Sequence, residues 1–179
     1  MAVTLNETPS GNRLHIGIFG KTNSGKSSFI NTFSGQKVSI VADVAGTTTD
    51  PVYKSMEIYP LGPCVLIDTA GFDDEGELGA LRIEKTSLAA QKTELAIILF
   101  CEDEMVQELK WYNYFKKRQT PVIPVLGKAD LYTQEQKEYL IQMIQKNTGE
   151  TVCPVSSETG EGIRKLKELL TEKIPEGYG

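Results

Sequence analysis

A glycine-rich segment near the start of the chain, from Gly20 to Ser27, has the spacing G-x-x-x-x-G-K-[ST] at every fixed position. Its two glycines, Gly20 and Gly25, let backbone N–H groups approach one anion without a Cβ in the way. Lys26 supplies a point charge that can bridge the β- and γ-phosphates of a nucleotide. The hydroxyl of Ser27 is the expected ligand of Mg²⁺. The segment therefore predicts a site for a nucleoside triphosphate and its magnesium ion.

The segments on either side agree with such a loop. Residues 14–19 are apolar and typical of a strand, and residues 27–33 have the apolar spacing of a helix. Such a helix would turn its positive N-terminal end toward the phosphates. The alternative is a glycine-rich turn that matches by chance, which the flanking strand and helix disfavour. The expected phosphate-contacting residues are Gly20, Lys21, Thr22, Asn23, Ser24, Gly25, Lys26, Ser27 and Ser28.

Strands and helices alternate along the rest of the chain. Residues 52–59 alternate in polarity and connect through a short turn to the apolar residues 64–67, so this pair should be antiparallel. Pro124 and Pro154 indicate irregular or edge positions in their strands. Further strands are expected at residues 95–100, 122–126 and 152–155, and helices at residues 80–92, 103–117, 134–146 and 162–173. The pattern predicts an α/β fold: a six-stranded, mostly parallel sheet with one antiparallel edge strand, helices on both faces, and the site at the C-terminal strand ends.

The composition fits one domain. The chain has 179 residues, of which 40% are hydrophobic and 24% charged, and we expect a nucleotide-binding domain over residues 13–174. A flexible polar arm over residues 1–12 and the start of a linker over residues 175–179 should flank it. The net charge is −5, and residues 116–118 form the only basic cluster. This charge argues against a nucleic-acid partner.

Cysteine usage and hydropathy favour a cytoplasmic protein. Cys64, Cys101 and Cys153 are far apart and lie in or beside predicted strands, so we expect reduced core residues. His15 is the only histidine, which disfavours an internal Cys/His metal site. The longest apolar run, residues 95–101, is too short to span a bilayer, and the N-terminal residues lack the features of a signal peptide. We therefore expect no membrane partner.

Motifs at the strand ends resemble those of the Ras-like, translation-factor-related P-loop GTPases, and the resemblance implies the Ras-like fold. Asp68-Thr69-Ala70-Gly71 resembles their D-x-x-G motif, in which the aspartate orients Mg²⁺ and the glycine N–H contacts the γ-phosphate. Thr48 matches the switch threonine that coordinates Mg²⁺ while the γ-phosphate is present. Ser156-Ser157-Glu158 resembles the S-A-x loop, whose backbone contacts the guanine O6. The resemblance assigns Mg²⁺ to Ser27, Thr48 and Asp68, hydrolysis to Asn23, Lys26, Thr48 and Gly71, and a further nucleotide contact to Thr47.

The segment from Gly127 to Asp130 occupies the place of the N-K-x-D motif and includes its Lys128. The Asp130 carboxylate can accept N1–H and N2–H₂ of guanine, whereas adenine would leave a buried charge unpaired. Gly127 departs from the motif because it lacks the amide that ties this loop to the base, so we expect weaker nucleotide binding. A helix-initiating acid is the alternative for Asp130 considered alone.

Asn23 and residues 41–48 resemble the TrmE/Era branch of these GTPases, in which such an asparagine accompanies hydrolysis stimulated by potassium. The resemblance implies that Asn23 and the carbonyls of Ala42 and Val44 bind K⁺, in the place of an arginine finger. Alternatively, Asn23 only stabilises the loop. Phe72 stands where Ras-like proteins place a water-orienting glutamine, so we expect slow turnover. The acids among residues 73–77 could orient the water or could form a solvated loop.

Four longer strings are informative: Asn12–Gly20, Ala45–Lys54, Pro60–Pro63 and Asp68–Gly79. They resemble the HydF family, the GTPases of FeFe-hydrogenase maturation. The resemblance covers essentially the whole chain and implies GTP and GDP as ligands, a possible homodimer of G domains, and hydrogenase and other maturation proteins as partners of the full-length protein. HydF proteins also carry a dimerisation domain and an iron–sulfur cluster domain. We expect this chain to be the N-terminal G domain alone, without a cluster.

Two classes of function fit these observations. The chain is either an enzyme that hydrolyses GTP to GDP and phosphate, or a binding switch in which nucleotide state alone controls partner contact and hydrolysis only resets it. An RNA-linked GTPase is a third interpretation, which the negative charge disfavours.

Overall fold

The computed structural model describes residues 14–20, 25–34, 52–58, 62–69 and 87–173. They form a six-stranded sheet in the order β2-β3-β1-β4-β5-β6, with β2 antiparallel to β3 and every other neighbouring pair parallel. The predicted fold, including its one antiparallel edge strand, is therefore confirmed. The strands are β1 (Leu14–Phe19), β2 (Val52–Ile58), β3 (Gly62–Asp68), β4 (Leu95–Phe100), β5 (Val122–Leu126) and β6 (Cys153–Pro154).

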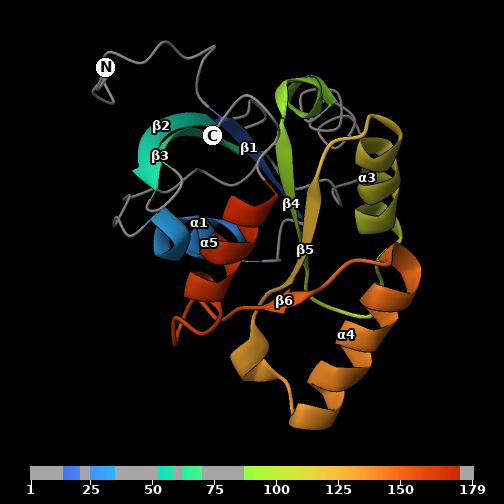
Figure 1. Cartoon of the computed structure of the whole chain (residues 1–179). Coiled ribbons are helices and arrows are strands. Elements are labelled where there is room, and N and C mark those ends of the chain that lie inside the picture. Colours follow the sequence, from blue (N-terminus) through green and yellow to red (C-terminus); the bar gives the residue numbers. More distant parts are fainter. Residues whose placement is uncertain (1–13, 21–24, 35–51, 59–61, 70–86, 174–179) are drawn as a thin grey trace, which may run out of the picture.

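Helices cover both faces of the sheet. The helices α1 (Lys26–Ser34) and α5 (Ile163–Glu172) lie on one face, and α3 (Val106–Lys117) and α4 (Gln134–Thr148) lie on the other (Figure 1). A short 3-10 helix, η2 (Ala129–Leu131), follows β5. Residues 87–92 are helical and are the described part of the helix predicted over residues 80–92. None of the described helices is long and apolar enough to span a membrane.

Strand β4 shows how the sequence pattern builds two cores. Every residue of β4 is buried. Leu95, Ile97 and Leu99 belong to the core under α1 and α5, whereas Ile98 and Phe100 belong to the core under α3 and α4. Successive side chains of a strand point to opposite faces, so an unbroken apolar run is required where both faces are covered.

Several predicted boundaries differ from the observed ones, among them those of β6 and α3. Strand β6 has only two residues and lies at the edge of the sheet, as its proline predicts. The Val155 N–H donates to the Leu126 carbonyl of β5, so the nitrogen of Pro154, one residue earlier, faces the free edge. Helix α3 begins at Val106 rather than at residue 103. The carboxylate of Glu104 accepts a hydrogen bond from the Val106 N–H at 3.2 Å, so this acid lies before the helix and pairs with an N–H of its first turn.

Pro124 is tolerated in β5, which is an internal strand. The carbonyl of Leu126 points to β6, where it accepts a hydrogen bond from the Val155 N–H. Main-chain groups of a strand alternate sides, so those of Pro124, two residues earlier, point to β6 as well. Pairing of β5 with β6 begins only at Val125. The N–H that Pro124 lacks would therefore point to the β6 side at a position where β5 is not yet paired with β6, so its absence removes no hydrogen bond between these strands.

The cysteines lie where the sequence places them. Cys64 and Cys153 are buried in strands, and Cys101 is half-buried directly after β4; none of the three forms a disulfide. Burial raises the pKa of the Cys153 thiol to about 11. This thiol therefore stays protonated at neutral pH.

A capping box starts helix α4. The Thr133 hydroxyl accepts from the Gln136 N–H at 3.1 Å, and the Gln136 side chain accepts from the Thr133 N–H at 2.9 Å. We predict that Thr133→Ala lowers the free energy of unfolding by about 1 kcal/mol, measured by urea denaturation. Thr171→Ala is the matched control, because the Thr171 hydroxyl donates only to the Lys167 carbonyl within α5. Equal stability of the two variants would contradict the assignment.

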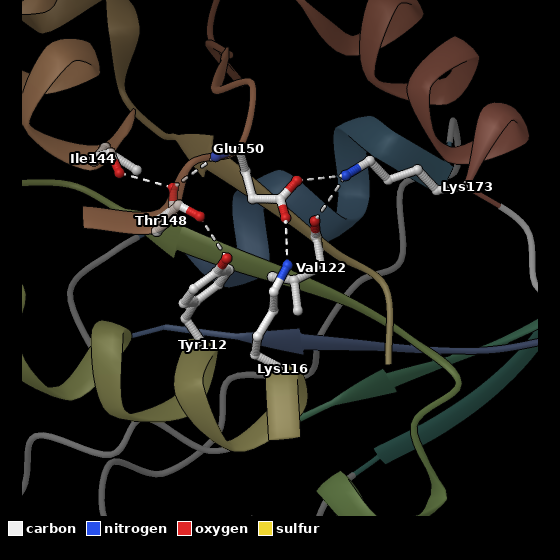
Figure 2. Close-up of polar contacts among 7 residues, drawn as sticks. All are labelled: Tyr112, Lys116, Val122, Ile144, Thr148, Glu150 and Lys173. Carbon is white, nitrogen blue, oxygen red and sulfur yellow. Dashed lines mark hydrogen bonds and ion pairs between the residues drawn. The ribbon is translucent and has the colours of Figure 1, made fainter. Parts of the chain in front are cut away.

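The Glu150 side chain joins three elements at the edge of the sheet where β5 begins (Figure 2). It accepts from Lys173 at 2.8 Å and from Lys116 at 3.4 Å, and Lys173 also donates to the Val122 carbonyl at 3.3 Å. Next to it, Tyr112 donates to the Thr148 carbonyl at 2.5 Å. The contacts fasten the ends of α3, α4 and α5 to one another.

The pKa of Glu150 should make this cluster sensitive to acid. Burial alone would raise the pKa of Glu150, but hydrogen bonds and charges from Lys173 and Lys116 outweigh burial, and the pKa falls below its ordinary 4.5. The stabilisation is therefore complete above pH 4.5 and is lost as the pH falls through the lowered folded-state pKa. We predict that Glu150→Gln destabilises the protein at pH 7 and that the difference from wild type shrinks toward pH 3 in urea unfolding. The exposed Glu168→Gln is the control, and a pH-independent difference would contradict the prediction.

Candidate nucleotide site

The predicted motifs come together at one edge of the sheet. Parallel strands end at the same edge, so the residues after β1, β3, β5 and β6 are neighbours there. These residues are Gly20, Thr69, Gly127 and Val155. Four stretches that are separate in the sequence therefore contribute to a single site.

Lys26 lies at the centre of this edge. Its side chain is only 6% exposed, and its Nζ donates to the Thr69 carbonyl, just after β3. The Thr69 hydroxyl in turn donates to the Ile18 carbonyl of β1 at 2.7 Å. A buried ammonium group held by a carbonyl is a strong attractor for an anion, because the site around it has a low dielectric constant.

Gly25 connects the phosphate loop to the loop after β5. Its φ of +84° lies in the left-handed region that favours glycine, and its carbonyl accepts the first helical hydrogen bond, from the Phe29 N–H at 2.8 Å. A Cβ at this position would lie 3.4 Å from Cε of Lys128. The aliphatic stem of Lys128 therefore packs against the phosphate loop, so two of the predicted motifs are in direct contact.

A pocket of about 310 Å³ opens between the phosphate loop and the two loops that follow β5 and β6. It brings together Ser28, Lys128, Asp130, Ser157 and Glu158, all of which the sequence assigns to nucleotide binding. Its full lining is Gly25, Ser28, Phe29, Leu99, Gly127, Lys128, Asp130, Leu131, Val155, Ser157 and Glu158.

Asp130 and Ser156 are held together beside this pocket. The Ser156 hydroxyl donates to Oδ1 of Asp130 at 2.7 Å and accepts from the Thr159 N–H at 3.1 Å. Ser156 is fully buried, and the Ala129 N–H donates to the Val155 carbonyl at 2.9 Å, which fixes the two loops to each other. The Asp130 carboxylate is thus oriented by Ser156 instead of capping a long helix, since η2 has only three residues.

Sequence reasoning missed the apolar walls of the pocket. Phe29, Leu99, Leu131 and Val155 line it, and Leu131 is 70% exposed. Apolar side chains suit the faces of a purine, which are poorly hydrated. Leu131 carried the one readable signal, because it is an apolar residue within a polar loop directly after Asp130.

Two further predicted site residues, Asp68 and Ser27, lie within the described part of the chain. Asp68 is half-buried at the end of β3, and Ser27 is in the first turn of α1. The remaining residues of the phosphate loop, the potassium ligands and the switch residues lie outside the described part of the chain. They are Lys21, Thr22, Asn23, Ser24, Ala42, Val44, Thr47, Thr48 and Gly71.

The departure at Gly127 has a measurable consequence. Gly127 lines the pocket, and its N–H donates to the Phe100 carbonyl at 2.8 Å. It has no side chain with which to bridge the base and the phosphate loop. We predict that Gly127→Asn raises GDP affinity about three- to tenfold, because one added hydrogen bond contributes about 0.5–1.5 kcal/mol. Isothermal titration calorimetry measures this directly, and unchanged affinity in a stably folded variant would contradict it.

Comparisons with known proteins agree with this geometry. A family profile described as "50S ribosome-binding GTPase" matches residues 15–128. The chain is 36% identical to the GTPase Der of Wolinella succinogenes, over 97% of this chain and 38% of Der. It is 35% identical to the tRNA modification GTPase MnmE of Aliarcobacter butzleri, over 80% of this chain and 33% of MnmE. The chain thus spans well under half the length of these relatives.

Solved structures extend the likeness to three dimensions. Era of Aquifex aeolicus, bound to GDP and AlF4⁻, superposes with a TM-score of 0.76 at 27% identity, over 91% of this chain and 57% of Era. A structure of Era with MgGDPNP and a segment of 16S ribosomal RNA gives a TM-score of 0.75 at 26% identity, with the same coverage. The chain therefore belongs to the GTPase family whose profile matches residues 15–128. It is a GTP-binding and GTP-hydrolysing P-loop domain of the branch that includes Era, Der and MnmE.

Proposed function

We propose that the chain is a nucleotide switch in which GTP hydrolysis at Lys26 resets contact with a partner. The pocket that joins the phosphate loop to Asp130 supports this proposal most directly. Lys26 would bind the phosphates, and Asp130, oriented by Ser156, would select guanine. A segment whose conformation depends on the γ-phosphate would then make contact with the partner depend on the bound nucleotide.

Magnesium fits the residues that the sequence assigns to it. Asp68 pairs with Ile18 across β1 and β3, so its carboxylate comes from the strand end next to the phosphate loop. Hydroxyl and carboxylate oxygens are the ligands that Mg²⁺ prefers. We propose that Ser27, Asp68 and, in the GTP state, Thr48 hold the ion, which would neutralise charge on the phosphates when bound.

Potassium would complete the site in this proposal. The sequence support is Asn23, with Ala42 and Val44 as carbonyl ligands. GTP turnover should rise in K⁺ relative to Na⁺ at equal ionic strength, and Asn23→Ala should remove the difference. Equal turnover of wild type in the two salts would refute the potassium site. GTP hydrolysis that is absent in both salts, with intact GTP binding, would favour the binding switch over the enzyme.

Two biological settings compete. The HydF-like strings, among them Ala45–Lys54, support a cytoplasmic role in hydrogenase maturation, with hydrogenase and maturation proteins as partners of the full-length protein. The names of the relatives support an RNA-linked role instead, since MnmE is described as a tRNA modification GTPase and Era has been solved with ribosomal RNA. The net charge of −5 opposes binding to a phosphate backbone.

Disruption of the gene separates the two settings. We favour hydrogenase maturation, so loss of the gene should abolish hydrogen evolution and leave tRNA modification unchanged. The opposite result, with normal hydrogen evolution and altered tRNA, would establish the RNA-linked role. Complementation with Lys26→Met tests whether the phenotype depends on the nucleotide site.

A further inference from the structure

A second pocket, of about 410 Å³, opens beside the start of α4. Its α4 residues follow η2 in the sequence, whereas the nucleotide pocket includes residues of η2 and of the loop before it. It shares no lining residue with the nucleotide pocket. Side chains from the segment after β4 and from the first turns of α4 form its walls. They are Cys101, Glu102, Asp103, Tyr132, Glu135, Gln136, Tyr139 and Leu140.

The walls of this pocket are preformed and partly aromatic. The Tyr132 hydroxyl donates to the Cys101 carbonyl, which fastens one wall to the other, and burial raises the pKa of Tyr132 to about 12, so it remains a neutral donor. The capping box at Thr133 fixes the start of α4. Tyr139 is 57% exposed, which leaves the ring available to a ligand. Little ordering would be needed on binding.

The charged residues that line this pocket are all acidic. Glu102, Asp103 and Glu135 line it, and none of its lining residues is basic. The positive end of the α4 dipole lies nearby, but Glu135 in the first turn of that helix counters it. An acidic, aromatic hollow attracts a cation and repels a phosphate backbone.

We propose that this pocket binds an arginine side chain, flanked by apolar residues, on a partner protein. A guanidinium is planar, so it can stack on a tyrosine ring while it donates to carboxylates at its edges. The flanking apolar residues would pack on Leu140 and the exposed face of Tyr139. This interaction surface is separate from the nucleotide site and adds a docking contact to the proposed switch.

Short peptides test the proposal on the 179-residue chain. The probes are the N-acetylated amides Leu-Arg-Leu and Leu-citrulline-Leu. Their central side chains are similar in size and shape, but citrulline is neutral and has a carbonyl oxygen in place of one guanidinium nitrogen. Amide chemical shifts in ¹H–¹⁵N spectra report binding and its location. We expect Leu-Arg-Leu to shift the amides of Tyr132, Glu135 and Tyr139, with about tenfold weaker binding of the citrulline peptide.

Variants identify the groups that bind the peptide. Tyr139→Ala and the double variant Asp103→Asn with Glu135→Gln should each weaken Leu-Arg-Leu binding about five- to tenfold. The exposed Glu172→Gln on α5, on the other face of the sheet, should leave binding unchanged. Equal binding of the two peptides, shifts located away from the pocket, or equal shifts with the RNA oligonucleotide rU₁₀ would overturn the proposal.

Discussion

Replacing Lys26 with methionine should reduce GTP turnover about 10²- to 10³-fold, because a preorganised positive charge next to the transferred phosphoryl group is lost. Lys26 is buried and its ammonium group is held by the Thr69 carbonyl, so the charge is already in place before a nucleotide binds. Methionine keeps most of the apolar stem and therefore preserves packing near the start of α1. Single-turnover hydrolysis at saturating GTP separates this loss from weaker binding.

The control for this variant is Lys165→Met on α5, where the lysine is exposed. Both variants remove one positive charge, so a general electrostatic effect would appear in both. Circular dichroism and melting temperature establish that the Lys26 variant is folded. Turnover of the folded Lys26 variant within threefold of wild type would show that the phosphate loop is not the catalytic site.

The parts of the fold that the sequence predicts well are those determined by local patterns. The unbroken apolar run over residues 95–100 and the shorter run over residues 122–126 coincide with β4 and β5, since only strands covered on both faces need such runs. The start of α4 at Gln134 agrees with the helix predicted over residues 134–146 from its apolar spacing. The short length of β6 and the late start of α3, after Glu104, were not predictable in this way.

The residues of the nucleotide site also differ in how well the sequence predicts them. Motif residues such as Lys26 and Asp130 can be recognised in the sequence, because their chemistry requires a fixed residue type at a fixed spacing. The apolar walls of the nucleotide pocket cannot be recognised in this way, since Phe29 and Leu99 meet only through the order of strands in the sheet. The hydrogen bond from Ser156 to Asp130 also joins residues from two separate loops. No local pattern indicates such a contact.

Replacing Asp130 with asparagine should lower GDP affinity about 10²-fold or more, since guanine would face a donor where it needs a second acceptor. The same change should raise affinity for xanthosine diphosphate, because the asparagine N–H₂ can donate to the C2 carbonyl that xanthine has in place of the guanine amino group. A ligand whose edge matches the new side chain thus restores binding to the altered protein. Competition titrations with GDP, xanthosine diphosphate and ADP, against a fluorescent nucleotide, measure all three affinities.

This reversal of preference separates recognition from folding. A variant that merely unfolded the pocket would lose every nucleotide, whereas loss of GDP with gain of xanthosine diphosphate requires an intact pocket whose selecting group has changed. Asp103→Asn makes the same chemical change outside the nucleotide pocket and should leave both affinities unchanged. Wild-type protein that binds ADP as tightly as GDP would contradict selection by Asp130. An Asp130 variant that keeps its GDP affinity would show that the oriented carboxylate beside Ser156 serves only to join the loops after β5 and β6.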